Sequence, residues 1–284
     1  MFAFSQIGFA ITDDPSLLCK RGNKKKMAAS DELGIWLINL DRDVERRRKM
    51  EQQLDALGLT YSRFSAIYGK DHIEALSKRA DAAAYSRNMG SDILPGKMGC
   101  YASHLAVWEA FLASDHDVAL ILEDDVVFHD DFLECLELAV ASSDHWDTVR
   151  FNCIRAKLPI SQGRIGPYTL NAYAGPFTGN AAYLIKRDVA QRILPNLWPQ
   201  TRALDHELNR FFIHDFRQFG LEPFPSHVDD GNQSSITGTG FALVKKYPWY
   251  RRLPHYLLKA ANYFRRAIWL GKKGRLWPRR TKLQ

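Results

Sequence analysis

The chain has 284 residues, of which 46% are hydrophobic and 25% charged, as in ordinary globular proteins with a large core. No apolar run approaches the roughly 18 residues of a membrane-spanning helix, and the four cysteines show no CxxC spacing, which favours reduced thiols in a cytoplasmic protein. The net charge of +7 is unevenly placed, because residues 245–284 hold 13 Lys and Arg and no acid. The remaining chain carries 26 basic and 32 acidic side chains, so its charge gives no reason to expect nucleic-acid binding.

Residues 1–30 differ from the rest of the chain because they show no clear periodicity. Their apolar start is followed, not preceded, by a basic cluster, which makes a poor secretory signal. They are interpreted as a disordered extension, as an upstream start with Met27 as the true first residue, or as an arm packed on the domain. We expect a single domain over 31–244 and a separate tail over 245–284.

From Gly34 onward, short apolar runs alternate with amphipathic stretches, the pattern of an α/β fold with a parallel sheet. A strand over 35–40, a helix over 43–57 and a strand over 60–67 make the first βαβ unit. Further strands are expected at 118–125, 147–153, 179–185 and 221–228. Further helices are expected at 72–84, 99–113, 132–141, 188–194 and 204–212, with a loop at 85–94 and a hairpin or mobile loop region at 155–178.

The strand that begins at residue 118 ends in three consecutive carboxylates, Glu123, Asp124 and Asp125. Ligands of α/β sheets bind just beyond the carboxyl ends of strands. Two such charges about 5 Å apart repel by roughly 3 kcal/mol at an effective dielectric near 20, and Mg²⁺ or Mn²⁺ would remove that repulsion. In an extended chain, Glu123 and Asp125 would share one side and Asp124 would face the other. The alternative is a solvated strand end leading into a helix capped by Asp130 or Asp131.

Other charged residues are candidates for the same site. Arg42 and Arg46 follow the first strand and could face an anionic ligand, although basic residues on a surface helix are more often solvated. Asp205 would be well placed as a general base if its helix begins near the metal. The alternative is that Asp205 and Glu207 stand in the first turn because acids there interact favourably with the helix dipole. His227 could complete a metal shell or be a surface histidine.

Cys100, His104 and Trp108 are spaced four residues apart and share one helix face. A Cys–His nucleophilic pair would need a group to activate it, and none is evident. Zinc would need two further ligands at a suitable spacing. A packed core histidine is the simpler interpretation of His104.

Four sequence blocks resemble glycosyltransferase family 25, which includes bacterial lipooligosaccharide galactosyltransferases and collagen galactosyltransferase domains. The resemblance covers roughly residues 34–236, and its order and spacing are more specific than any one block. The first block departs from the pattern in its three consecutive arginines and the second in Lys97, where an acid is common. The blocks are INLDRDVERRRKM (38–50), GKMGCYASHLAVW (96–108) with LILEDDVVF (120–128), GNAAYLIKRDVAQRIL (179–194) and ALDHELNRFF (203–212).

The resemblance implies a GT-A-type, Rossmann-like nucleotide-sugar transferase fold with one mixed central sheet. It also implies an inverting enzyme that uses UDP-galactose and a divalent cation, Mn²⁺ or Mg²⁺, and that acts on a lipooligosaccharide or another surface glycan. Asp205, with Glu207 as second choice, would deprotonate the acceptor hydroxyl. Donor binding is assigned to Asn39, Arg42, Arg46, Ser103, His104 and Asp124. Metal binding is assigned to Glu123, Asp125 and His227.

Other function classes remain open from the sequence. The donor could be UDP-glucose or another UDP-sugar, because one hydroxyl configuration is read by one or two hydrogen bonds that no motif identifies. A metal-dependent hydrolase or phosphotransferase could use the same acidic turn, but no glycine-rich phosphate loop is present. A non-catalytic module that binds sugar nucleotides or glycans is the third class.

The tail has a basic and an apolar side when drawn as a helix. Its tryptophans and its charge are typical of a segment that lies on an anionic membrane surface. This suits an enzyme placed on the cytoplasmic face of a bacterial inner membrane; a basic surface helix packed on the domain and a nucleic-acid tail are the alternatives. The basic side holds Arg252, Lys259, Arg266 and Lys273, and the apolar side holds Leu257, Ala261, Phe264 and Ile268.

Overall fold

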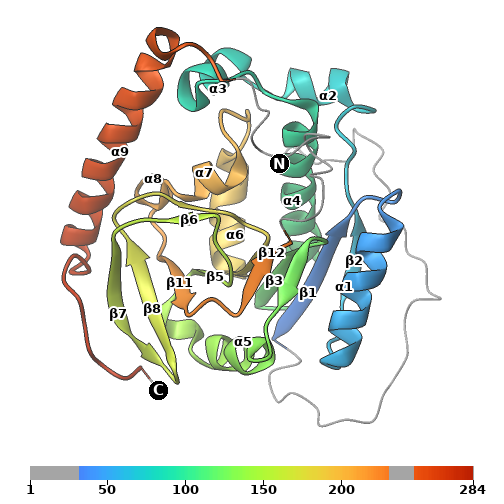
Figure 1. Ribbon diagram of the computed structural model, residues 1–284, viewed down its shortest axis with the longest axis vertical. Coiled ribbons are helices and arrows are strands. Elements are labelled where there is room, and N and C mark those ends of the chain that lie inside the picture. Colours follow the sequence, from blue (N-terminus) through green and yellow to red (C-terminus); the bar gives the residue numbers. More distant parts are fainter. Residues whose placement is uncertain (1–31, 230–245, 284) are drawn as a thin grey trace.

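A computed structural model describes residues 32–229 and 246–283 (Figure 1). The predictions for residues 1–30 lie outside this described part. The strands are β1 (Leu33–Asn39), β2 (Ser62–Ser65), β3 (Val118–Glu123), β4 (Val126–Phe128), β5 (Thr148–Arg150), β6 (Arg155–Ala156), β7 (Pro159–Ile165), β8 (Tyr168–Tyr173), β9 (Phe177–Thr178), β10 (Ala182–Lys186), β11 (Gln218–Glu222) and β12 (Ser226–Val228).

Eight strands form one mixed sheet in the order β2-β1-β3-β10-β5-β11-β8-β7. β1, β2 and β3 run parallel, and Ile38 of β1 lies opposite Glu123 of β3. β10 pairs antiparallel with β3 and with β5. All of β1 and all but the last residue of β3 are buried, as expected of apolar strands packed on both faces. The expected Rossmann-like α/β fold with one mixed central sheet is therefore confirmed.

Nine α-helices lie in the part of the chain that the structure describes. Figure 1 shows α1 at one edge of the molecule and α9 at the opposite edge, with α4 beside the central strands. No helix of the described residues is both long and apolar enough to cross a membrane. The helices are α1 (Val44–Ala56), α2 (Ile73–Lys78), α3 (Ala82–Met89), α4 (Pro95–Ala113), α5 (Phe132–Ala141), α6 (Arg187–Ile193), α7 (Leu204–Leu208), α8 (Phe211–His214) and α9 (Leu253–Lys272).

The helix α4 is nearly enclosed by the rest of the molecule, with ten buried residues between Met98 and Phe111. It starts at Pro95, four residues earlier than predicted, because proline is well tolerated in the first helical turn. Its early part passes very close to the segment after β2. A Cβ on Gly99 would lie 2.3 Å from the Ile67 carbonyl oxygen, so only glycine allows this approach.

Four further predicted segments, one of them a loop, are wrong in their boundaries. The helix predicted over 72–84 is two helices, because the Asp81 side chain accepts a hydrogen bond from the Ala84 N–H (2.8 Å) and starts α3. The α3 helix continues into the loop predicted over 85–94 and ends at Gly90, which adopts the left-handed conformation. The helix predicted over 204–212 is divided into α7 and α8, and the strand predicted over 221–228 is divided into β11 and β12 on either side of Pro223.

The predicted helix in the tail is present as α9, and of its basic side Arg266 is buried against the domain whereas Lys259 and Lys273 are exposed. Arg266 is only 3% exposed, and its Nε donates to the carbonyl oxygen of Ala174 (2.9 Å). Trp269 donates to Asp215 (2.9 Å) and packs on Phe211. The side of α9 that packs on the domain is therefore mixed, with Arg266 and Leu270 both buried, and the apolar side with Leu257, Phe264 and Ile268 is left toward solvent.

Candidate active site

A pocket of about 700 Å³, including the space at its mouth, lies where β1, β2 and β3 end. Because these three strands are parallel, their carboxyl ends meet at one edge of the sheet, which is where α/β proteins bind ligands. One face of α4 closes the other side. The lining includes Asn39 and Leu40 after β1, Ile67, Tyr68 and Gly69 after β2, Glu123, Asp124 and Asp125 after β3, Cys100, Ser103 and His104 from α4, and Arg46 from α1.

The acidic turn is held by Arg46 and Asn39. The Arg46 guanidinium donates to Asp124 Oδ1 (3.0 Å) and to Asp125 Oδ2 (3.2 Å). Asn39 Nδ2 donates to the other oxygen of Asp124 (2.6 Å). The chain turns after Glu123 instead of staying extended, so Asp124 and Asp125 both reach Arg46 and the predicted alternation of sides is wrong.

The α1 helix also fixes the chain that leaves the acidic turn. Gln53 Nε2 donates to the carbonyl oxygen of Val126 (3.0 Å), and its Oε1 accepts the N–H of Phe128 (2.8 Å). A single side chain thus satisfies two backbone groups of β4. The turn is consequently preorganised by α1 from both sides, through Arg46 before it and Gln53 after it.

Burial makes the acidic turn electrostatically costly. It raises the pKa of Asp124 to about 6, although the Asn39 hydrogen bond and the Arg46 charge oppose it. Burial and the charge of Glu123 raise the pKa of Asp125. Asp125 Oδ1 is buried and accepts no hydrogen bond from the described residues. A bound divalent cation would satisfy this oxygen and offset the carboxylate repulsion, so the residues present fit a cation.

A chain of hydrogen bonds leads from the core to Glu123. Trp108 Nε1 donates to the hydroxyl oxygen of Tyr183 (2.8 Å), and that hydroxyl lies 3.1 Å from His104 Nδ1. His104 Nε2 lies 3.1 Å from Glu123 Oε1. A carboxylate can only accept, so Nε2 carries the proton and Nδ1 accepts the Tyr183 hydroxyl. His104 therefore orients Glu123, and it is neither an isolated core histidine nor solvated.

Cys100 joins His104 and Glu123 one turn earlier on α4. One ligand atom from each of these three residues lies within 4.8 Å of the others, and no further cluster of this kind occurs in residues 32–229 and 246–283. Burial, then the charge of Glu123, raises the pKa of the Cys100 thiol well above its usual range. The thiol is therefore protonated at neutral pH unless a cation displaces the proton.

Two residues assigned to donor binding have other partners. Ser103 Oγ accepts the N–H of Ile67 (2.8 Å) and donates to the Gly99 carbonyl (2.8 Å), so it joins α4 to the segment after β2. The Arg42 guanidinium lies over the Tyr68 ring, 3.8 Å from its centroid, and Tyr68 lines the pocket whereas Arg42 does not. Ser103 is thus occupied in the framework, and Arg42 is connected to the pocket through its contact with Tyr68.

Asp205 is not part of the pocket lining. Its carboxylate accepts the backbone N–H groups of Gly179 (3.2 Å) and His206 (2.9 Å). Burial would raise the pKa of Asp205, but the charges of His206 and Arg150 outweigh it and lower the pKa. Its charge also acts on the Cys100 thiol, so the two groups are close enough to interact.

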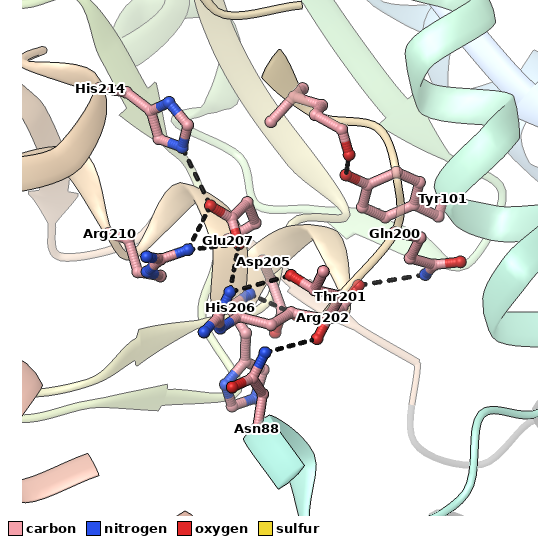
Figure 2. A network of polar contacts seen from close by, with 11 residues as sticks. Asn88, Tyr101, Gln200, Thr201, Arg202, Asp205, His206, Glu207, Arg210 and His214 are labelled. Atoms are coloured by element: carbon pink, nitrogen blue, oxygen red, sulfur yellow. Dashed lines mark hydrogen bonds and ion pairs between the residues drawn. The ribbon is translucent and has the colours of Figure 1, made fainter. Parts of the chain in front are cut away.

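Glu207 is the centre of an ionic cluster (Figure 2). It accepts from Arg202 (3.0 Å), Arg210 (2.8 Å) and His214 (3.0 Å). Burial alone would raise the pKa of Glu207, but the His214 hydrogen bond and the two arginine charges hold it at about 2. A carboxylate with three cationic or hydrogen-bonding partners is a weak base, so this geometry favours a structural role.

His227 is not brought to the acidic turn by its side chain. Its Nδ1 lies 2.8 Å from His129 Nε2, on the small β4–β12 sheet. The cluster of metal-ligating groups found in the described residues does not include it. The assignment of His227 to the metal therefore gains no support from the geometry.

Sequence reasoning did not assign roles to Tyr68, Gln53 and Tyr183. Tyr68 could have been found from its place just after β2, because parallel neighbours end at the same edge. Gln53 and Tyr183 act on other residues rather than on a ligand, and no spacing rule connects them to the acidic turn across 70 or more residues. Only the folded structure shows those two contacts.

Comparisons with known proteins place this chain in a family. A sequence model described as "Glycosyltransferase family 25 (LPS biosynthesis protein)" matches residues 33–207. A glycosyltransferase 25 family member of Aedes aegypti is 29% identical over 60% of this chain and 29% of its own length. Procollagen galactosyltransferase 1-B of Xenopus laevis is 24% identical over 72% of this chain and 38% of its own.

A third relative shows that the family includes proteins described as lacking activity. The probable inactive glycosyltransferase 25 family member 3 of Rattus norvegicus is 24% identical over 45% of this chain and 24% of its own length. The chain spans less than two fifths of the length of these three relatives. The family match nevertheless covers more than half of the chain and contains the acidic turn and the α4 residues that line the pocket, so the chain belongs to glycosyltransferase family 25.

Proposed function

We propose that the protein is an inverting galactosyltransferase that moves galactose from UDP-galactose to a hydroxyl of a lipooligosaccharide or another surface glycan. The observation that carries this proposal is the buried acidic turn at the sheet edge, with the Asp125 Oδ1 left without a hydrogen bond among the described residues. Support for galactose comes from the relative named a procollagen galactosyltransferase. UDP-glucose and other UDP-sugars are the competing donors.

Different residues in and beside the pocket have different roles in binding the donor. Glu123 and Asp125 would hold a Mn²⁺ or Mg²⁺ ion, which when bound neutralises diphosphate charge as UDP leaves. Arg46 and Asn39 fix Asp124 and Asp125 in place, so their main role is to position the turn. Tyr68 in the pocket lining and Arg42 beside it offer a ring and a cation to the nucleotide.

The acceptor hydroxyl needs a base on the side of the sugar opposite to UDP. Asp205 remains the first choice, because it is only partly buried, its carboxylate accepts two backbone N–H groups instead of side-chain cations, and its charge acts on Cys100 in the pocket wall. Glu207 is a weaker candidate than the sequence indicated, because both of its carboxylate oxygens already accept hydrogen bonds from three side chains. In a single displacement the base takes the proton while the acceptor oxygen forms its bond to the anomeric carbon.

The experiment is a calorimetric titration of UDP, UDP-galactose and UDP-glucose, each with Mn²⁺ and with chelator. Metal-dependent binding that is lost in Asp125→Ala and retained in Asp144→Ala, an acid outside the pocket lining, would support the acidic turn as the donor site. A preference between the two sugars would identify the donor. A folded protein that binds no UDP compound with metal present would refute the proposal and favour a non-catalytic module.

We also propose that the enzyme works on an anionic membrane surface, at the cytoplasmic face of a bacterial inner membrane, with α9 as the contact. Leu257, Phe264 and Ile268 are 64%, 72% and 58% exposed. With Leu253 they fall within about 60° of one another at 3.6 residues per turn. A helix that packs on the domain with one side and leaves a second, apolar side outward suits a lipid surface.

The charge around this apolar face supports a membrane over a second copy of the chain. The exposed residues Arg265 and Lys272 border it, and residues 245–284 contain no acid. Two copies placed face to face would bring these cations together, whereas anionic lipid attracts each at about 1 kcal/mol. Trp249 and Trp277 are exposed near the two ends of α9, as expected of interfacial anchors.

Vesicle sedimentation with the full chain tests the membrane proposal. Replacing Leu257, Phe264 and Ile268 by Ser should weaken binding to vesicles rich in phosphatidylglycerol on the order of 1,000-fold, since each side chain contributes about 1.5 kcal/mol on burial. Ile73→Ser and Ile154→Ser, which change exposed apolar residues elsewhere, should bind like the wild type. Equal binding by the triple variant would refute the assignment of this face.

A further inference from the structure

We propose that Cys100, His104 and Glu123 form a site for a thiophilic divalent cation of the zinc class, in the wall of the same pocket. This goes beyond the proposed function, which needs only a hard cation held by carboxylates. One sulfur, one nitrogen and one oxygen atom lie within 4.8 Å of one another. All three residues line the pocket, so an ion can enter and can keep one position open to water or to a ligand.

The fold brings these ligands together by two separate constraints. Cys100 and His104 are four residues apart on α4, which places them on one helix face. Glu123 is the last residue of β3 and already contacts His104 Nε2 at 3.1 Å. Gly99, next to Cys100, packs against the Ile67 carbonyl and Gly69, and so fixes the height of α4 against the sheet edge.

The kinds of donor atom indicate which ion fits best. Zinc is commonly bound by thiolate, imidazole and carboxylate, and sites with three protein ligands keep a fourth position free. A thiolate favours Zn²⁺, Cd²⁺ or Co²⁺ over Mg²⁺ and Mn²⁺, which prefer oxygen. Because Glu123 supplies an oxygen to either kind of ion, a hard cation in the acidic turn and a thiophilic cation beside it compete for one residue.

His104 can ligate an ion with a change of tautomer and no change of charge. Its Nδ1 contacts the Tyr183 hydroxyl, and a histidine ligand normally has such a partner on its second nitrogen. When Nε2 gives up its proton to bind an ion, Nδ1 takes one and donates to the Tyr183 oxygen. That oxygen can accept from both His104 and Trp108, because it has two lone pairs.

The Tyr183 hydroxyl hydrogen, which then turns away from His104 Nδ1, has another acceptor nearby. The Asn180 side chain interacts with Tyr183, and Asn180 Oδ1 is buried and accepts no hydrogen bond from the described residues. The proton balance is then complete. The Cys100 S–H bond breaks as the sulfur–metal bond forms, and its proton leaves to solvent. The His104 Nε2 proton also leaves to solvent and a solvent proton adds at Nδ1, so the histidine stays neutral and Tyr183 keeps its hydroxyl proton.

The test uses Co²⁺ as a spectroscopic substitute for Zn²⁺ on the full chain. Wild type should show an intense near-ultraviolet sulfur-to-cobalt charge-transfer band, and Zn²⁺ added afterwards should abolish it. Cys100→Ser should lose the band, while Tyr183→Phe should keep the band and bind Co²⁺ about tenfold more weakly, as variants in the partners of metal ligands do. Cys153→Ser, which changes another half-buried thiol, should keep the band.

The outcomes separate this proposal from the proposed function. Absence of the band in wild type, or a band that persists in Cys100→Ser, would overturn the thiolate site even if UDP binds with Mn²⁺. A band lost only in Cys100→Ser would support the site even if no UDP compound binds. Circular dichroism of Cys100→Ser confirms that the variant is folded. If both proposals hold, Zn²⁺ should lower Mn²⁺-dependent UDP affinity in wild type and leave it unchanged in Cys100→Ser.

Discussion

Replacing Glu207 by Gln tests whether this carboxylate stabilises the fold or takes part in chemistry. In the structure it is buried among Arg202, Arg210 and His214, and its pKa is held at about 2 against an ordinary value of 4.5. A shift of about 2.5 units at about 1.4 kcal/mol per unit corresponds to about 3 kcal/mol of stability at neutral pH. Removing the charge leaves two buried arginines without their partner, so a loss of this order is expected.

The stabilisation by Glu207 should decrease as the pH is lowered. The folded-state pKa of Glu207 lies below the unfolded value, so its contribution is fully present above about pH 4.5 and is lost as the pH falls toward 2. Urea unfolding of wild type and Glu207→Gln should therefore differ by about 3 kcal/mol at pH 7 and by less than half of that near pH 3. Glu74→Gln, which breaks an exposed pair with Lys78, should change stability by less than about 0.5 kcal/mol.

Transfer activity completes the test of Glu207. Assayed well below its unfolding temperature, Glu207→Gln should retain most of its turnover if the residue is structural. Unchanged stability together with abolished turnover would refute this reasoning and return Glu207 to the role of general base. A stability difference that does not decrease with acid would show that the carboxylate charge is not the source of the effect.

Three further predictions concern separate parts of the molecule. Asp205→Asn should abolish transfer while calorimetry shows nearly unchanged UDP affinity; near-normal turnover would remove Asp205 from the role of base. Gly99→Ala should lower the melting temperature and weaken UDP binding, because its Cβ would lie 2.3 Å from the Ile67 carbonyl oxygen; a variant that behaves like wild type in both assays would show that α4 can shift freely. Leu54→Ala, at a fully buried position on α1, should cost about 2–5 kcal/mol in urea unfolding, and a loss below about 1 kcal/mol would contradict the packing described for α1.

The central sheet could be predicted because its strands are continuous apolar runs. β1 and β3 are buried along almost their whole length, and such runs followed by polar residues mark both the strand and the edge where ligands bind. The breaks between shorter helices were harder to see. The Asp81 cap that starts α3 competes with an unbroken alanine-rich pattern, and the sequence alone does not show which prevails.

The candidate site could be predicted only in part. Arg46 and Asp124 were both singled out from their positions after strands, and the structure brings them within 3.0 Å. The role of Ser103 was inferred from the family resemblance alone, and its hydroxyl instead joins α4 to Ile67. Contacts such as the one between Gln53 and Val126 depend on how α1 crosses the sheet, and that crossing is set by tertiary packing rather than by local pattern.

The segment after residue 245 contacts the domain at several places far apart in the chain. Tyr247 bonds to the carboxylate of Asp92, His255 lies 2.7 Å from the carbonyl oxygen of Asn88, Arg266 reaches Ala174, and Arg279 donates to Ser161. Each contact keeps the next at a high effective concentration, so the segment dissociates only when several contacts break together. If α9 anchors the protein to lipid, the attachment is correspondingly stiff, and thermal motion of the membrane surface is transmitted to the whole domain instead of being absorbed by a flexible linker.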